Sequence, residues 1–267
     1  PVVITDSSTA SLGIVHSLKF LGIQIIQLDS DFSHPSAQTS FTKKVRCENM
    51  SDEIGFLDVL IETAKKCNKK PVLFLTSDEY VRIVSNNREL LQKYYHFSLP
   101  DPFVVKTLLD KDSFAEYARK KKLQIPQTIT LNGSENLKEA VARQRYPCIM
   151  KPIIKTATWG KKYGIHKAFR INSTSEFIKE AEEYFSVTNI PLIIQEWIEG
   201  PESTIHFCLV HYNQDSKCKE YFTGKKLLQW PPEVGNTCIA ESTQNEYISC
   251  ESINFFNKIN FKGLGSL

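Results

Sequence analysis

Strands and helices alternate along the first hundred residues, and this order restricts the fold more than any other feature of the chain. Short apolar runs at 2–5, 23–28 and 72–75 are separated by segments at 11–21 and 52–66 that carry apolar residues at helical spacing. Strands joined by helices of this length pair in parallel, and a parallel sheet needs cover on both faces. We therefore predict an α/β domain built on a parallel sheet.

Two prolines around an acid, in the segment 99–102, mark a break after these repeats. We expect one domain over 1–102 and a second over 103–267. In the second, the pattern predicts an extended segment, five helices and a series of strands, with a last strand beginning near 263. The helices are expected at 103–109, 112–122, 135–143, 173–184 and 243–258, the extended segment at 125–131, and strands at 148–151, 190–196, 204–211 and 220–228.

The composition excludes several classes of protein. The formal net charge is +3, and no dense basic face with interleaved aromatics occurs, so we expect no nucleic-acid partner. No apolar stretch approaches the length of a membrane span, so we also expect no membrane partner. The seven cysteines lack metal-ligand spacing and are interpreted as small, reduced core residues of a cytoplasmic protein.

The loop after the first strand is not a dinucleotide-binding loop. It contains Gly13 but lacks the other glycines of the G-x-G-x-x-G pattern. The carboxyl ends of parallel strands nevertheless meet at one edge of a sheet and often form a binding crevice there. Asp6, Ser7 and Asp29 would line such a crevice for a different ligand.

Two lysines stand at the edges of predicted elements in the second domain. Lys111 begins a helix, and Lys151 ends the apolar strand that starts at Cys148. A lysine in either place can act as a point charge on a bound phosphate. The alternative for Lys111 is an exposed lysine at a helix start.

The segment 155–164 follows Lys151 and is polar, basic and rich in small residues. Backbone N–H groups of a loop with such residues can surround the β- and γ-phosphates of a nucleotide. A plain hairpin turn would have the same composition, and no Walker A pattern is present. The candidate phosphate-binding residues in this segment are Thr156, Ala157, Trp159 and Gly160.

A strand rich in isoleucine runs into an acidic connector at 195–202. An extended backbone beside a flat base can offer one C=O and one N–H to an adenine edge, so Gln195, Glu196, Trp197 and Ile198 are candidate base contacts. Glu202 follows a Gly-Pro bend and is placed to accept hydrogen bonds from ribose hydroxyls. The alternative is an ordinary strand followed by an acidic turn.

Two adjacent cations, Lys225 and Lys226, precede a Pro-Pro turn. Their positive charges could bind an anionic intermediate or a substrate carboxylate, and we consider them candidate catalytic residues. An exposed edge strand protected by lysines would show the same pattern.

Taken in order along the chain, these segments resemble the ATP-grasp superfamily, in particular its carboxylate–amine ligase-like members, related to the carbamoyl-phosphate synthase large chain and to biotin carboxylase. The resemblance extends over nearly the whole chain. It rests on the turn 76–81, on 110–114 followed by 125–128, on 146–152 and on 195–202. It implies a pre-ATP-grasp domain followed by α+β ATP-grasp subdomains.

The resemblance also implies roles for these residues. Lys111 and Lys151 would hold the ATP phosphates, the segment 155–164 would close over them, and Glu196 and Ile198 would meet adenine through the backbone. Small-molecule carboxylate and amine substrates would be joined through an acylphosphate, with Mg²⁺ stabilising the transferred phosphoryl group. A carboxylase or carbamoyl-phosphate-type enzyme, or a nucleotide-binding protein without catalysis, shares the same nucleotide features.

One departure concerns the metal. The metal-binding carboxylate and asparagine of the superfamily lie on strands beyond the segment 263–267, so we expect no metal ligands in this chain and an incomplete last subdomain. By this interpretation the parent protein is an ATP-dependent ligase, and these 267 residues alone turn over poorly or not at all. The sequence identifies neither substrate, and a homodimer is compatible with it.

Overall fold

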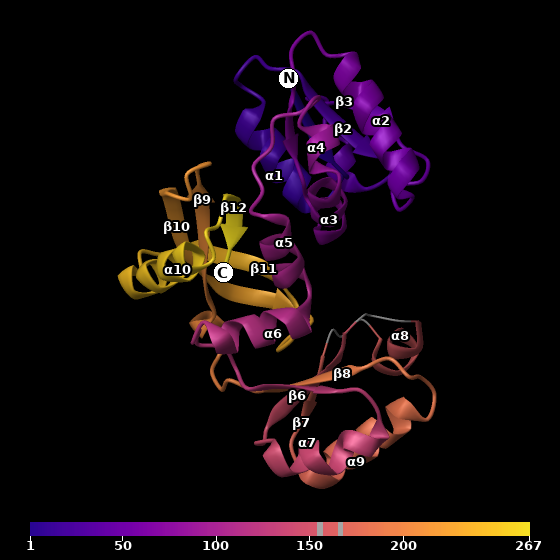
Figure 1. The fold of residues 1–267 in the computed structure, drawn as a ribbon, viewed down its shortest axis with the longest axis vertical. Coiled ribbons are helices and arrows are strands. Elements are labelled where there is room, and N and C mark those ends of the chain that lie inside the picture. The colour runs from indigo at the N-terminus through magenta and orange to yellow at the C-terminus, as the bar shows by residue number, and fades with distance from the viewer. Residues whose placement is uncertain (154–156, 165–167) are drawn as a thin grey trace. The chain divides into compact units, whose positions relative to one another are not determined.

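The computed structural model describes residues 1–153, 157–164 and 168–267. It divides the chain into two compact units (Figure 1). Unit 1 consists of Pro1–Leu109, Asn213–Asp215 and Phe261–Gly263, and unit 2 of Asp110–Tyr212, Ser216–Asn260 and Leu264–Leu267. The domain boundary expected at residue 102 stays a prediction.

Unit 1 contains the predicted parallel sheet. Its strands lie in the order β3-β2-β1-β4, and all three pairings are parallel. The predicted strands and helices of this region are confirmed, with ends shifted by a few residues, whereas β3 was not expected. The elements are β1 Val2–Thr5, α1 Thr9–Leu18, β2 Ile25–Asp29, β3 Lys43–Arg46, α2 Glu53–Lys65, β4 Val72–Phe74, α3 Asp78–Asn86, α4 Arg88–Leu91 and α5 Pro102–Leu109.

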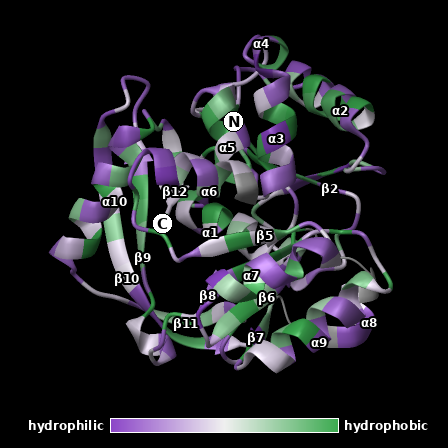
Figure 2. Cartoon of the chain, turned by 60° about the horizontal axis from the view of Figure 1, so that its bottom comes forward, coloured by the Kyte–Doolittle hydropathy of each residue, from purple (hydrophilic) through white to green (hydrophobic). Residues whose placement is uncertain are grey.

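Apolar packing of helices on this sheet stabilises unit 1. Phe56 and Leu60 on α2 are completely buried, and the Phe56 ring stacks on Tyr80 of α3 with centroids 5.0 Å apart. Figure 2 shows hydrophobic and hydrophilic residues alternating around α2, as expected for a helix with one buried face. Asp52 begins this helix by accepting a hydrogen bond from the Gly55 N–H at 3.1 Å.

Unit 2 contains two further sheets. The first has the strand order β5-β8-β6-β7, and the second has the order β11-β10-β9-β12. The elements are α6 Lys111–Lys120, β5 Thr128–Leu131, α7 Leu137–Arg143, β6 Cys148–Pro152, α8 Ala157–Tyr163, β7 Phe169–Ile171, α9 Thr174–Phe185, β8 Leu192–Glu196, β9 His206–Tyr212, β10 Cys218–Trp230, β11 Asn236–Ser242, α10 Glu246–Lys258 and β12 Gly263–Ser266.

Both sheets have a helical layer on one face. Along β6, Cys148 and Met150 are completely buried and belong to the same apolar cluster as Phe177 of α9 and Leu137 of α7. Helix α10 packs on the second sheet, where the Tyr212 hydroxyl donates to the Ile253 carbonyl at 3.1 Å. One face of each sheet is therefore fixed by core packing.

The cysteines are distributed less uniformly than expected. Cys47, Cys148 and Cys208 are buried, and burial raises the pKa of the Cys148 thiol to about 12. Cys238 and Cys250 are exposed, so the core interpretation is wrong for these two. Every described cysteine is a free thiol.

Side chains cap the first turn of α9, and this cap allows a stability prediction. The Ser173 hydroxyl accepts from the Glu176 N–H at 3.3 Å, and the Glu176 carboxylate accepts from the Asn172 N–H at 2.7 Å. We expect Ser173→Ala to lower the free energy of unfolding by about 1 kcal/mol, because an N–H of the first turn loses its acceptor. Urea denaturation measures this loss. Ser173→Thr keeps a hydroxyl acceptor and should remain close to wild type; equal losses for both variants would contradict the capping role.

Candidate nucleotide site

The site lies on the face of the β5-β8-β6-β7 sheet that α7 and α9 leave open. Strand pairing places Thr128, Gln195, Ile149 and Arg170 in one row across the four strands. Side chains alternate between the faces of a strand, so the open face of β6 carries Ile149 and Lys151 while Cys148 and Met150 point into the core. Sheet register thus brings four segments of the sequence to one surface.

Lys151 is held on this open face by its neighbour on β8. Its ammonium donates to the Gln195 side-chain carbonyl at 3.0 Å, and the Gln195 amide donates to the Thr128 hydroxyl at 2.9 Å. Lys151 is half-buried, so its cation is directed by the sheet and does not extend freely into solvent. The structure therefore brings together two of the predicted nucleotide contacts, Lys151 and Gln195.

The connector after β8 is anchored on both sides. The Glu196 N–H donates to the Gln127 carbonyl at 2.8 Å, and the Trp197 N–H donates to the Pro147 carbonyl at 3.3 Å. These two bonds fix the start of the connector. The adenine contact expected through the backbone of Glu196 and Ile198 stays a prediction.

Arg170 of β7 reaches across β6 to this connector. Its guanidinium lies 4.7 Å from the centre of the Trp197 ring and forms an ion pair with Glu199 at 2.9 Å. This contact was not predicted, because the arginine belongs to a three-residue strand that the sequence pattern does not indicate. Only the pairing of β7 with β6, and of β6 with β8, reveals that Arg170 lies in the same row as Gln195.

Glu202 binds the chain that follows β10. Its two carboxylate oxygens accept from the Gln229 N–H at 3.0 Å and from the Glu233 N–H at 3.1 Å. These contacts fix the turn after Trp230. The Glu233 N–H, together with the Gln229 donors, lowers the pKa of the Glu202 carboxyl.

This carboxylate gives a pH prediction. Because the folded-state pKa of Glu202 is depressed, its contribution to stability is present above the unfolded-state pKa and is lost as the pH falls through the folded-state pKa. We expect carboxyl NMR of Glu202 to show a titration midpoint below that of an ordinary glutamate side chain. Glu202→Gln should accelerate hydrogen exchange at the Gln229 and Glu233 amides. A midpoint at or above that of an ordinary glutamate, with unchanged exchange, would contradict the anchoring role.

Lys225 and Lys226 lie inside β10, which pairs with β9 on one side and β11 on the other. The edge-strand alternative for these lysines is therefore wrong. The Lys225 ammonium pairs with Glu241 at 3.1 Å, whereas the Lys226 ammonium donates to the Gln229 side-chain carbonyl at 2.7 Å. Lys226 thus lies beside a residue whose backbone N–H is bound by Glu202.

The segment 155–164 differs from the loop expected there. Residues 157–163 form helix α8, because Trp159 is completely buried and packs edge-on against Tyr184 with centroids 6.0 Å apart. The loop expectation is wrong for this stretch, and Gly160 lies within the helix. Thr156 and the side chains of Ala157 and Lys111 lie outside the described residues, so their phosphate contacts stay predictions.

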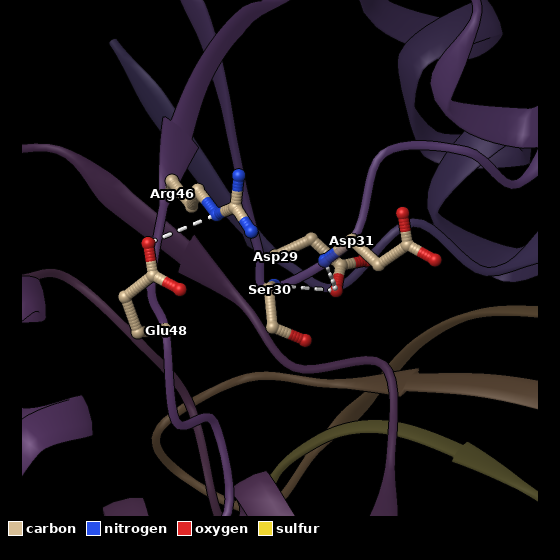
Figure 3. A network of polar contacts seen from close by, with 5 residues as sticks. All are labelled: Asp29, Ser30, Asp31, Arg46 and Glu48. Carbon is tan, nitrogen blue, oxygen red and sulfur yellow. Dashed lines mark hydrogen bonds and ion pairs between the residues drawn. The ribbon is translucent and has the colours of Figure 1, made fainter.

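The crevice expected in unit 1 has polar groups at the carboxyl ends of its strands. Asp6 accepts from the Ser8 N–H at 2.9 Å. One oxygen of Asp29 accepts from the N–H groups of Ser30 at 2.7 Å and Asp31 at 3.2 Å (Figure 3). These bonds shape the loops after β1 and β2.

Comparisons with known proteins identify the fold. No family model matches the chain. A curated relative, "D-aspartate ligase" of Enterococcus faecium (strain Aus0004), is 23% identical over 244 residues, which cover 86% of this chain and 58% of the relative. The chain thus spans less than two thirds of that protein's length.

Solved structures share this fold over almost the whole length of the chain. The ADP complex of purK, an N5-carboxyaminoimidazole ribonucleotide synthetase, superposes with a TM-score of 0.70 at 14% identity and covers 99% of this chain and 64% of its own. An L-amino acid ligase from Bacillus licheniformis gives a TM-score of 0.69 at 14% identity, with coverages of 99% and 61%. The chain therefore shares the fold of these structures, the ATP-grasp fold. The predicted fold class, a parallel-sheet domain followed by ATP-grasp subdomains, is confirmed.

Proposed function

We propose that this chain binds ATP on the open face of the β5-β8-β6-β7 sheet and is part of an ATP-dependent carboxylate–amine ligase. The observation that carries the proposal is the hydrogen bond from Lys151 to Gln195, the residue that directly precedes the anchored connector 196–198. A cation and an exposed backbone edge on one surface suit the two ends of an adenine nucleotide. Structural neighbours that are ADP or ATP complexes support the same ligand.

The chemistry would proceed in two steps. A carboxylate oxygen attacks the γ-phosphorus of ATP, the bond to the β-phosphate oxygen breaks, and an acylphosphate and ADP form. An amine then attacks the acyl carbon, phosphate leaves with the bonding electrons, and the amine loses a proton as the amide forms. Lys151 would hold nucleotide phosphate oxygens, and Lys226 would be placed near an anionic intermediate.

Mg²⁺ is a further proposed cofactor, because it neutralises charge on transferred phosphoryl groups. Among the described residues, however, no three histidine, cysteine, aspartate or glutamate side chains gather as a metal site. The described part of the chain therefore supplies no such cluster of metal ligands, and the roles given above to its residues do not depend on a bound metal. No described helix is long and apolar enough to cross a membrane, and a cytoplasmic location with small-molecule carboxylate and amine partners is part of the proposal.

Isothermal titration calorimetry tests the proposed nucleotide binding. We expect one ADP or ATP to bind per chain, with an affinity that changes little when Mg²⁺ is added, since the described residues offer no metal site. Absence of nucleotide binding in both conditions would contradict the proposal. A large requirement for Mg²⁺ would contradict the expectation that these residues bind the nucleotide equally well without the ion.

Measurements of turnover test the proposed ligase activity. We expect the 267-residue chain to release no measurable ADP, and a longer chain to release ADP only when a carboxylate and an amine are both present. Amino acids are the first carboxylates to test, because the curated relative is a D-aspartate ligase. Measurable ligation by the 267 residues alone would overturn the first expectation. Nucleotide binding without turnover in the longer chain would favour a non-catalytic protein.

A carboxylating ATP-grasp enzyme is the second candidate. It is favoured by the carboxyaminoimidazole ribonucleotide synthetases among the structural neighbours. The same ADP-release assay separates the two candidates, because only a carboxylase would require bicarbonate.

A further inference from the structure

Unit 2 contains a cavity between β7 and the turn 231–235, which follows β10. Its volume is about 390 Å³, within the range of small-molecule sites. Arg170 of β7 and Lys162 of α8 line one side, and Glu233 lines the side formed by the turn. All the residues around this cavity belong to unit 2.

The β7 side of the cavity adjoins Lys151. Strands β6 and β7 are antiparallel, and their register sets Met150 opposite Phe169. One step further along each chain, the same register sets Lys151 opposite Ala168, which lines the cavity. Residues directly opposite one another share a face of the sheet. A ligand in the cavity therefore lies near the cation proposed to hold the nucleotide phosphates.

The two cations that line the cavity are paired with carboxylates. Lys162 pairs with Glu180 and Glu183, both at 2.9 Å, so two carboxylates face one ammonium. Arg170 pairs with Glu199 at 2.9 Å. These contacts leave an excess of negative charge on this side, which disfavours a phosphate or carboxylate ligand.

Glu233 adds a carboxylate from the turn. Its backbone N–H donates to Glu202 at 3.1 Å, whereas its own carboxylate forms no ion pair with a cation of the described residues. Glu233 is exposed, so a ligand can reach this carboxylate from solvent. The cavity therefore offers an unpaired anion to a positively charged ligand.

The turn holds Glu233 in an uncommon conformation. The residue has a φ of 67°, a value that residues other than glycine rarely adopt. The Val234 N–H donates to the Pro232 carbonyl at 2.8 Å, and a Cβ at Gly235 would collide with the Pro231 carbonyl oxygen. Such conformations persist where the surrounding structure enforces them, and they are frequent at ligand-binding sites.

We propose that this cavity binds the amine substrate of the ligation as an ammonium ion, with the Glu233 carboxylate as its counter-ion. The assignment rests on the proposed ligase function. Phe169, Pro232 and Val234 supply apolar lining, so the ligand expected is an ammonium group on an apolar carbon skeleton. An amine held here lies near Lys151, where the acylphosphate would form.

Three small probes of similar shape test the charge preference of the cavity. At neutral pH benzylamine is a cation, benzyl alcohol is uncharged and benzoate is an anion. We expect wild type to bind benzylamine about 5-fold more tightly than benzyl alcohol, and benzoate more weakly than either, because one exposed ion pair contributes up to about 1 kcal/mol. NMR titration of the Val234 amide measures these affinities. Equal binding of benzylamine and benzyl alcohol would overturn the assignment.

Variants at Glu233 separate its charge from a structural role. Glu233→Gln should weaken benzylamine binding about 5-fold and leave benzyl alcohol within twofold of wild type. Glu233→Lys should bind benzoate at least as tightly as benzylamine, a change that damage to the fold would not produce. Glu220→Gln, at an exposed glutamate of β10, is the matched control and should bind every probe as wild type does. A Glu233→Lys variant that still prefers benzylamine would overturn the counter-ion role.

Calorimetry with ADP separates this assignment from the proposed function. Glu233→Gln should bind ADP within twofold of wild type, because the amine and the nucleotide occupy different places. A larger loss would put the nucleotide in the cavity and overturn the amine assignment. If wild type binds ADP but not benzylamine, the amine site fails while nucleotide binding stands. If wild type binds no ADP, the proposed function fails, and the assignment that rests on it fails as well.

Discussion

Replacing Trp159 with alanine is expected to lower the free energy of unfolding by about 3–5 kcal/mol, the range found when large buried aromatics are truncated. Trp159 is completely buried in the apolar cluster of unit 2. Helix α8 has seven residues, too few to be stable alone, so its attachment depends on tertiary contacts. Removing the indole leaves a cavity beside Tyr184 and releases that helix.

Urea denaturation followed by circular dichroism measures this loss. Trp159→Phe retains part of the packing and should recover a substantial share of the stability. Trp230→Ala is the matched control, because Trp230 is 65% exposed and its removal should change stability by less than about 0.5 kcal/mol. A loss below about 1 kcal/mol for Trp159→Ala would contradict a core role and favour the nucleotide contact expected from the sequence.

Replacing Lys151 with methionine is expected to weaken ADP binding by about 10- to 100-fold. A charged hydrogen bond to a phosphate contributes about 1.5–3 kcal/mol, and each 1.4 kcal/mol corresponds to a factor of ten in affinity. Methionine keeps the length of the side chain but removes its charge. Tripolyphosphate binding should fall as well, because the lost charge acts on the phosphates and not on the base.

Calorimetry with ADP and tripolyphosphate measures both effects. Lys179→Met, an exposed lysine on α9, is the matched control and should bind both ligands as wild type does. Because Lys151 also donates to Gln195, the unfolding free energy of the variant must be measured in parallel. Unchanged ADP affinity in a folded Lys151→Met variant would contradict a phosphate role.

The parallel sheet of unit 1 was predictable because its local signals agree with its packing. Val2–Thr5 is apolar throughout and is buried throughout, as a central parallel strand must be. Asp52 was expected to open a helix and is the N-cap of α2. At such places, propensity, capping and burial favour the same structure.

The elements that the sequence missed are short or depend on partners. β7 has three residues, and β11 is exposed along its whole length, so neither has an alternation of apolar and polar residues. Helix α8 has a glycine and small residues that favour a loop, but the burial of Trp159 outweighs them. Tertiary contacts decide the structure in all three cases.

The residues of the candidate site likewise include some that local sequence places and others that only tertiary contacts place. The place of Lys151 near the end of β6 was predictable, because an apolar strand running into a lysine and a proline is visible in the sequence, while its phosphate contact stays a prediction. Arg170 was not predictable, because only the pairing of β7 with β6 aligns it with Gln195. The anchoring of Gln229 and Glu233 by Glu202 likewise joins residues 27 or more positions apart.

A crystal of the chain grown with saturating ADP tests the central claim most directly. Difference density should place the diphosphate beside Lys151, the base beside the 196–198 connector, and the ribose between them. Density for ADP at any other place on the chain, or none at a concentration where calorimetry reports full occupancy, would contradict the assignment of the nucleotide to this face.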